Sequence, residues 1–372
     1  LDKFDIGDVT TALEGRSISA KELVDLQISQ IKLREKELNC YVTLDTKQAQ
    51  IAATRSDQRR NDNKLLSAID GIPIAVKDNL NVSDLPTRNG SKFTHPVSGD
   101  ATVIKALRNS GAIIIGKLNM DECAIGGTTN NPHYGPTINP WKPGFVPGGS
   151  SGGAGSAVAG GLAWAAIGTD TLGSVRLPAA YCGVVGLKAT RGLISMNGIV
   201  PLSPSLDHVG PLCRSVRDAR TFLNILAEGK IHVHSEGKNP HLFRSRVGVL
   251  EAALGPQSDI AVADAFERAV EDLRHFGAHI TKVSLPDYDF HIGTYEVTNA
   301  QYVQFLNSVA SVDDYLLYDQ KMGQMDLDRG LGGITRSGSA GDYSYSVVPE
   351  LANYPVTYVS FWDAARYVNW LS

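Results

Sequence analysis

The part of the sequence best suited to chemistry is VPGGSSGGAGSAVAGG, residues Val146–Gly161. Seven of its last 14 residues are glycine, and Ser150 and Ser151 lie among them. Glycine loses more conformational freedom on folding than other residues, so a dense cluster indicates tight turns or close backbone approach. Such turns cradle anions on backbone N–H groups or expose a nucleophile. A flexible linker is disfavoured, because Pro147 precedes the cluster and the helix-like run SAVAGGLAWAA follows.

A second serine motif and a lysine add to this site. GTDTLGSVRLP places Ser174 directly after a glycine, at the end of a strand-like run. Lys77 closes GIPIAVK, a compact apolar run of the kind found in buried strands. Burial that lowers a lysine pKa from about 10.4 toward 7 costs on the order of 4 kcal/mol and yields a general base. Lys77 is therefore a candidate base for a serine nucleophile.

Two short motifs compete with this interpretation. Residues 111–118, GAIIIGKL, fit the first part of a phosphate-binding loop but end in leucine where Ser or Thr should bind magnesium, so a nucleotide site is disfavoured. GGSSG, residues 148–152, satisfies the nucleophile elbow of α/β-hydrolases, which also needs a later histidine. His208, His275 and His279 are present, but nothing in the sequence places any of them beside Ser150.

Composition excludes several classes of protein. The 372 residues are 42% hydrophobic and 20% charged with a net charge of −4, which gives no general attraction to nucleic acid or anionic membranes. No apolar run approaches the ~20 residues of a membrane span, and we expect no signal peptide. Four cysteines without CxxC pairing predict a reduced, cytoplasmic protein without a metal site. The pair His232 and His234 lacks further ligands and is interpreted as loop.

Helical patterns alternate with short apolar runs, which favours an α/β sheet covered on both faces. The expected strands are residues 40–44, 71–77, 112–116, 163–168, 247–250 and 279–283, and the expected helices are 20–38, 47–60, 102–110, 217–227 and 260–276.

The sequence changes character near residue 290. Nine of the 13 tyrosines lie in residues 291–372, and the alternation of helix and strand fades. Residues 330–341, GLGGITRSGSAG, are interpreted as a glycine- and serine-rich loop. We therefore expect two modules, 1–290 and 291–372.

Four motifs, in their order and spacing, resemble the amidase-signature family. They are GIPIAVKDN, VPGGSSGGAGSAVAGG, GTDTLGSVRLPAAYCGVVGLKAT and SPSLDHVGPLCRSV. The family includes general amidases and the A subunit of the tRNA-dependent glutamine amidotransferase. The resemblance implies the family's α/β fold, a mixed sheet with helices on both faces. Family members continue well over a hundred residues beyond position 290, so an incomplete core is expected here.

The resemblance implies a role for each matching residue. Ser174 would be the nucleophile, Lys77 the general base, and Ser150, preceded by a cis peptide, the serine that relays the proton between them. The supporting residues would be Ser151 in the serine network, the backbone N–H groups of Thr171, Leu172, Gly173 and Ser174 as oxyanion hole, and Asp170 and Arg176 as braces of that loop.

The implied reaction is hydrolysis of a carboxamide C–N bond, with release of ammonia or an amine and without metal or cofactor. The substrate would be a small carboxamide, with nucleic acid involved only in an amidotransferase complex; the oligomeric state stays open. GGTTNNPHY, residues 126–134, resembles general amidases more than the amidotransferase component. Leu172 departs from the family's Gly or Ala and is expected to crowd the acyl pocket or strain the loop. Ala189 replaces a proline, a small change. A catalytically dead fragment is the alternative.

The tail resembles the beginning of a formylglycine-generating-enzyme (sulfatase-modifying factor) domain. The matching segments are YEVTNAQYVQFLN at 295–307 and NYPVTYVSFWDAARYVNWL at 353–371. The cysteine-bearing part of that family has no counterpart here, so the resemblance assigns no catalytic role. It implies an irregular, glycine-rich partial module over 291–372.

Overall fold

The computed structural model describes residues 4–231, 245–250, 258–283, 297–313, 317–325, 331–357, 359 and 367. The chain forms two compact units, residues 1–238 and 239–372. This division precedes the boundary expected at residue 290. His232 and His234 lie outside the described residues.

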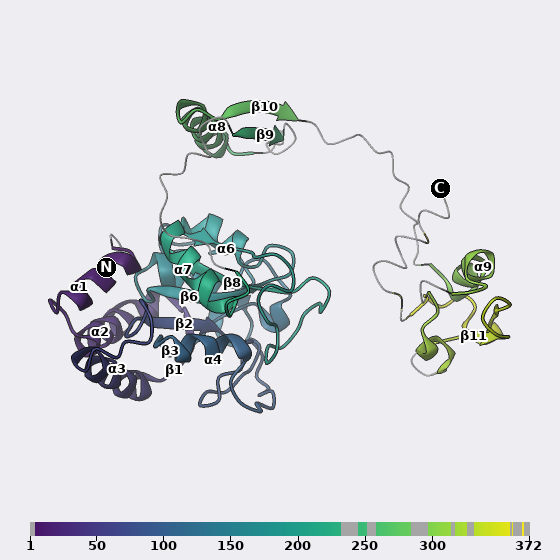
Figure 1. Cartoon of the computed structure of the whole chain (residues 1–372), viewed down its shortest axis with the longest axis horizontal. Coiled ribbons are helices and arrows are strands. Elements are labelled where there is room, and N and C mark those ends of the chain that lie inside the picture. The colour runs from purple at the N-terminus through teal and green to yellow at the C-terminus, as the bar shows by residue number, and fades with distance from the viewer. Residues whose placement is uncertain are drawn as a thin grey trace. The chain divides into compact units, whose positions relative to one another are not determined.

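A six-stranded mixed sheet organises the first unit (Figure 1). Its central strand β2 (Pro73–Lys77) is parallel to both neighbours, β3 (Ile113–Leu118) and β6 (Ala165–Asp170). The other strands pair antiparallel to their neighbours, so the sheet is mixed. The order across it is β1-β3-β2-β6-β8-β7, with β1 at Tyr41–Leu44, β7 at Val185–Gly186 and β8 at His208–Cys213.

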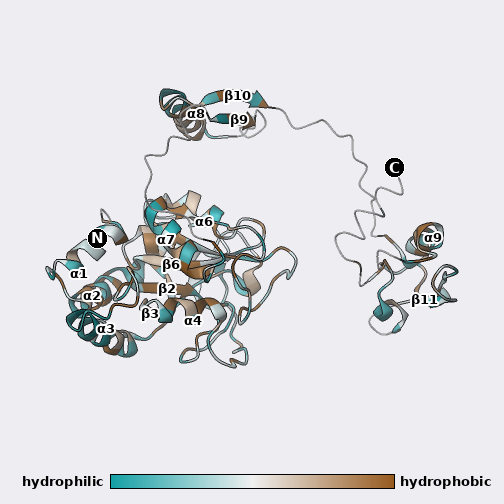
Figure 2. Ribbon diagram, in the orientation of Figure 1, coloured by the Kyte–Doolittle hydropathy of each residue, from teal (hydrophilic) through white to brown (hydrophobic). Residues whose placement is uncertain are grey.

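Both faces of the sheet are covered, as the sequence predicts. Every residue of β2 and of β6 is buried, and successive side chains on a strand point to opposite faces. Figure 2 shows these strands as hydrophobic and α3 as largely hydrophilic. The helices of this unit are α1 (Ile6–Glu14), α2 (Ala20–Leu38), α3 (Thr46–Asn61), α4 (Thr102–Asn109), η1 (Glu122–Ala124), α5 (Gly152–Ala159), α6 (Arg176–Cys182) and α7 (Val216–Leu226), and a short pair β4 (Asn130–Asn131) and β5 (Gly135–Pro136) adds a hairpin.

Helix α5 differs from its predicted extent. It begins at Gly152, inside the glycine cluster, and ends at Ala159, whereas the pattern SAVAGGLAWAA predicted helix as far as residue 166. Gly161 has φ +77°, which stops the helix and turns the chain into β6. Close packing explains the glycines inside α5: a Cβ on Gly153 would lie 2.4 Å from the Asn119 carbonyl oxygen. The cluster therefore serves close approach.

The second unit contains a strand–helix–strand element and a separate aromatic cluster. β9 (Arg246–Leu250) and β10 (His279–Val283) are parallel, with α8 (Ile260–His275) between them in sequence, as predicted. In the cluster, the ring centroid of Tyr302 lies 5.3 Å from that of Phe305 and 5.8 Å from that of Tyr367. Its elements are α9 (Asn299–Val309), η3 (Gln320–Gly323), β11 (Ile334–Ser337), β12 (Ser344–Val347) and η4 (Pro349–Leu351).

The loop predicted at residues 330–341 is partly wrong. Ile334–Ser337 form β11, which pairs antiparallel with β12. Ile334 is fully buried, so one apolar side chain anchors a strand within a segment whose glycines and serines indicated only loop.

Candidate active site

The ends of two neighbouring strands bring Lys77 to the predicted serines. Lys77 is the last residue of β2, and Thr169 lies near the end of the parallel strand β6, so both end at the same edge of the sheet. The fully buried Lys77 Nζ donates to Ser150 Oγ at 2.8 Å and to Thr169 Oγ1 at 2.9 Å. The Asn79 side chain also donates to Thr169 Oγ1, at 3.1 Å. Lys77 is thus aimed at Ser150.

Ser150 is held on the turn that precedes α5. The Gly149–Ser150 peptide bond is cis, the geometry that the family resemblance implied. The Ser150 carbonyl accepts from the Asp121 N–H at 3.3 Å. A Cβ on Gly149 would lie 2.1 Å from Asp121 Oδ2, so no larger residue fits at that position. The turn therefore fixes the Ser150 hydroxyl against Lys77.

The electrostatic environment of Lys77 suits a base. Burial lowers the pKa of Lys77 from 10.5 to about 7, although the carboxylates of Asp121, Asp170 and Asp207 act in the opposite direction. A lysine with a pKa near neutrality is unprotonated in about half the molecules at pH 7 and can accept a proton. Burial dominates, because it penalises the charged ammonium form.

Ser174 reaches the site through its backbone. Its carbonyl accepts from the N–H of Ser151, the residue after Ser150, at 3.2 Å. The structure shows no hydrogen bond between the hydroxyl groups of Ser150 and Ser174, both of which it describes. Ser174 is 9% exposed, so a small molecule has limited access to its hydroxyl. Catalytic hydrogen bonds are often long in the absence of substrate. Ser151 itself donates through its hydroxyl to the Thr169 carbonyl at 3.1 Å and so joins α5 to β6.

A buried carboxylate organises the loop that carries Ser174. Asp170 accepts from the Gly173 N–H at 2.8 Å and the Val175 N–H at 3.2 Å, and from the Arg176 guanidinium at 2.9 and 3.0 Å. Burial alone would raise the pKa of Asp170, but these hydrogen bonds outweigh it and hold the pKa below its usual value. The loop therefore closes around Asp170.

The predicted oxyanion donors divide into two groups. The Gly173 N–H is taken by Asp170, whereas the described residues offer no hydrogen-bond partner to the N–H groups of Thr171, Leu172 and Ser174. The Thr171 hydroxyl donates to Asp207 Oδ1 at 2.6 Å and fixes that end of the loop. Three N–H groups therefore remain available to an anion.

The strain expected at Leu172 is absent. Leu172 is not among the residues with positive φ; in this loop Gly173, at φ +129°, takes that conformation. The Leu172 side chain is 86% exposed, so it points away from the buried groups of the site. The family's first glycine is replaceable here because its backbone adopts an ordinary conformation.

Comparison with known proteins places this geometry in a family. The model of the Amidase family matches residues 22–337. The chain belongs to the Amidase family. It is 38% identical over 303 residues to the A subunit of the glutamyl-tRNA(Gln) amidotransferase from Lachnospira eligens, covering 77% of this chain and 62% of that protein. The chain thus spans about three fifths of the length of the curated relatives it matches.

Solved structures of amidases share the fold. A crystal structure of an amidase is similar with a TM-score of 0.70 and 36% identity, covering 76% of this chain and 64% of that one. The peptide amidase from Stenotrophomonas maltophilia gives a TM-score of 0.68 and 31% identity, covering 76% of this chain and 62% of that one. The mixed α/β fold of the amidase family is therefore confirmed for this chain.

Sequence reasoning missed several polar residues around this amidase-family site. Thr169 and Asn79 contact Lys77 or its partner, and Asp121 and Asp207 hold the turns on either side. Thr169 and Asn79 lie inside the quoted motifs, next to residues that were assigned roles, which was the available signal. Lys117, a second fully buried lysine, gave no signal because it lies within the apolar run of β3.

The described residues of this amidase-family chain contain no group of three or more His, Cys, Asp or Glu side chains that could hold a metal ion. Within the same ranges, no helix has the length and apolar character needed to cross a membrane. All four cysteines are free thiols.

Replacing Asp170 by asparagine is expected to lower the free energy of unfolding by about 2–4 kcal/mol, because an amide cannot accept both the Arg176 fork and the backbone N–H groups. Urea denaturation at pH 7 measures this. The pKa of Asp170 is held low, so the advantage of the unmodified protein should be present above about pH 4 and shrink as pH falls below it. Asp84→Asn, which alters an exposed ion pair with Arg108, should change stability by less than about 1 kcal/mol. Equal effects from both variants would contradict the bracing role.

Proposed function

We propose that this chain is a serine amidohydrolase that cleaves a carboxamide C–N bond through Ser174, Ser150 and Lys77. The observation that supports it best is the 2.8 Å contact between the Ser150 hydroxyl and a buried lysine whose pKa is about 7. Serine needs an adjacent base to become a nucleophile at neutral pH, and a neutral amine in hydrogen-bond reach is such a base.

In the proposed reaction, Ser174 Oγ attacks the carbonyl carbon of the amide. Its proton passes to Ser150 Oγ, while the Ser150 proton passes to Lys77 Nζ. The tetrahedral intermediate collapses when the leaving amine takes a proton back along the same relay, which leaves an acyl group on Ser174. A water molecule, deprotonated by the same relay, then releases the carboxylic acid.

The oxyanion of the tetrahedral intermediate would be held by the N–H groups of Thr171, Leu172 and Ser174. Preorganised donors aimed at developing negative charge contribute more than any other single effect in many enzymes. Asp170 and Arg176 fix the loop that presents these donors. No metal or cofactor takes part in this scheme, and the proposed substrate is a small carboxamide.

A glutaminase that supplies ammonia to a partner protein is the second candidate function. It is favoured by the similarity to the curated A subunits of glutamyl-tRNA(Gln) amidotransferases, at 38% identity for the relative from Lachnospira eligens. Segment 126–134 favours a general amidase instead. Under the glutaminase proposal, tRNA is met only within a complex. In either case we infer a cytoplasmic protein.

Release of ammonia tests the proposed function. The purified chain is incubated with a panel of primary amides, glutamine included, and ammonia is measured by a coupled assay. We expect release that is lost in Ser174→Ala and kept in Ser156→Ala, which removes a buried α5 hydroxyl that is hydrogen-bonded to Cys40 and Ile138. Release from glutamine alone would favour the amidotransferase role. A folded protein that releases none would support a catalytically dead fragment.

For the tail we infer a second module that resembles the start of a formylglycine-generating enzyme. Its support is the motif pattern and a separate cluster of buried aromatic residues, among them Tyr302, Phe305 and Tyr345. The comparisons give it no support, and the Amidase model extends to residue 337, beyond the proposed boundary at 290. No activity is assigned to this module.

A further inference from the structure

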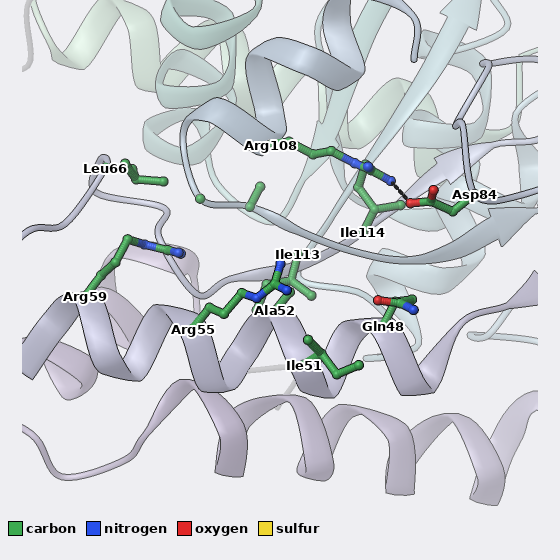
Figure 3. Close-up of a pocket in the computed structure, with 12 residues that line it drawn as sticks. Gln48, Ile51, Ala52, Arg55, Arg59, Leu66, Asp84, Arg108, Ile113 and Ile114 are labelled. Atoms are coloured by element: carbon green, nitrogen blue, oxygen red, sulfur yellow. Dashed lines mark hydrogen bonds and ion pairs between the residues drawn. The ribbon is translucent and has the colours of Figure 1, made fainter. Parts of the chain in front are cut away.

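A cleft of about 270 Å³ opens beside the sheet in the first unit, lined by none of the residues of the candidate active site (Figure 3). It lies between α3, α4 and the start of β3. Five side chains of α3 face it, namely Gln48, Ile51, Ala52, Arg55 and Arg59. Their spacing of three, one, three and four residues places them along one stripe of the helix. The cleft is therefore one continuous surface along α3.

Three guanidinium groups line this cleft, and two of them already have carboxylate partners. Arg59 makes a bidentate pair with the buried Asp70 at 2.7 and 2.8 Å. Arg108 pairs with Asp84 at 2.9 Å and with Asp100 at 3.3 Å. These carboxylates hold both groups in place and offset their charges.

Arg55 is the exception. Its side chain has no hydrogen bond or ion pair with any described residue, and Figure 3 shows its guanidinium lying over the cleft between Arg59 and Arg108. An arginine fork matches the geometry of carboxylate and phosphate groups and binds them bidentately. The unpaired positive charge therefore selects an anion.

The remainder of the lining is apolar. Ile113, Ile114 and Ile51 form the surface next to Arg55. An apolar cavity of about 150 Å³ accommodates benzene, so this cleft has room for an aromatic ring as well as an anionic group. Such a lining favours an apolar group attached to the anion over a bare inorganic ion.

We propose that this cleft binds a small organic oxyanion, a phosphate monoester or carboxylate joined to an apolar group, with Arg55 holding the charged end and the isoleucines the apolar end. The site is independent of the proposed amide hydrolysis, and its occupation is measured by binding alone.

Isothermal titration calorimetry with the full chain and phenyl phosphate tests this site. We expect saturable binding at a single site that Arg55→Gln weakens roughly 10-fold or more, as loss of a charge-assisted bidentate pair should. Lys47→Gln, which removes the same charge from an exposed position of α3 outside the cleft, should leave the dissociation constant within about twofold.

Parallel titrations identify which part of the ligand is recognised. Benzoate distinguishes carboxylate from phosphate, and either ligand binding with dependence on Arg55 supports the site. Inorganic phosphate should bind more weakly than phenyl phosphate if the apolar lining contributes. Absence of binding by phenyl phosphate and benzoate at millimolar concentration would overturn the proposal. Equal weakening by Arg55→Gln and Lys47→Gln would overturn it as well, since general charge would then explain the binding.

Discussion

Replacing Lys77 by methionine is expected to slow acylation of Ser174 by roughly 10²–10⁴-fold, the usual contribution of a positioned general base. The acylation rate of the unmodified protein should rise with pH through about 7 and level off above it, because neutral Lys77 is the active form. The methionine variant should lack this step. Rates measured by stopped-flow with an activated ester from pH 5 to 9 test both expectations. A step near pH 7 that survives in the variant would assign the titration to another group.

The same substitution should stabilise the folded protein. The pKa of Lys77 falls from 10.5 to about 7 on folding, which corresponds to about 5 kcal/mol of unfavourable free energy for the charged lysine. Methionine removes this penalty but also two hydrogen bonds worth about 1 kcal/mol each, so the net gain is on the order of 3 kcal/mol at pH 7.

The pH dependence of this gain has a defined sign. Below about pH 7 the lysine is charged in both folded and unfolded chains, so the penalty is constant. Between pH 7 and 10.5 the unfolded chain binds more protons, so stability of the unmodified protein rises with pH and the gain from methionine shrinks. Urea unfolding from pH 6 to 10 measures it. A variant less stable than the unmodified protein at pH 7 would contradict the account of Lys77 as a destabilising, functional residue.

Replacing Lys117 by methionine should have the opposite effect on stability, a loss of about 3–5 kcal/mol, because it leaves the buried Asp78 without its partner. Lys117 Nζ lies 3.5 Å from Asp78 Oδ1 and also donates to the Asp78 and Pro86 carbonyls at 3.2 Å. These contacts fix the chain just after Lys77. Urea unfolding at pH 7 compares Lys117→Met directly with Lys77→Met, two changes of identical chemistry on adjacent strands.

The Lys117–Asp78 pair offers a matched test of its cause. Burial raises the pKa of Asp78 and lowers that of Lys117 to about 8, so desolvation exceeds the attraction for both partners. The double variant Lys117→Met with Asp78→Asn should therefore recover most of the lost stability. The single variant should become relatively more stable as pH falls, because protonation neutralises Asp78. A double variant no more stable than the single one would assign the loss to packing.

Periodic apolar patterns in the first 290 residues predicted most of the sheet, because β2, β3 and β6 are short apolar runs flanked by turns. Strand β8 was missed: HVGPLC contains Gly210 and Pro211, which normally argue against a strand interior. Tertiary pairing with β6 overrides that preference. The extent of α5 was also missed, because glycine-rich helices form only where close packing compensates for poor propensity.

For the site, Lys77 and Ser150 could be named from motif and burial pattern alone, and the structure brings them into direct contact. Long-range hydrogen bonds could not be foreseen. Nothing in the local sequence indicates that Asp207 would hold Thr171 across 36 positions, or that Asp121 would close on the turn before Ser150. Such pairings depend on how distant turns meet at the sheet edge, which periodicity does not encode.

The most direct test of the central claim is to label the full chain with a fluorophosphonate and locate the adduct by mass spectrometry. The account predicts a phosphonylated Ser174, formed faster as pH rises through about 7, absent in Ser174→Ala and strongly slowed in Lys77→Met. An adduct on Ser150 with Ser174 unmodified would contradict it and indicate a nucleophile elbow instead. No adduct on a protein that unfolds cooperatively would show that the motif geometry persists without the activity.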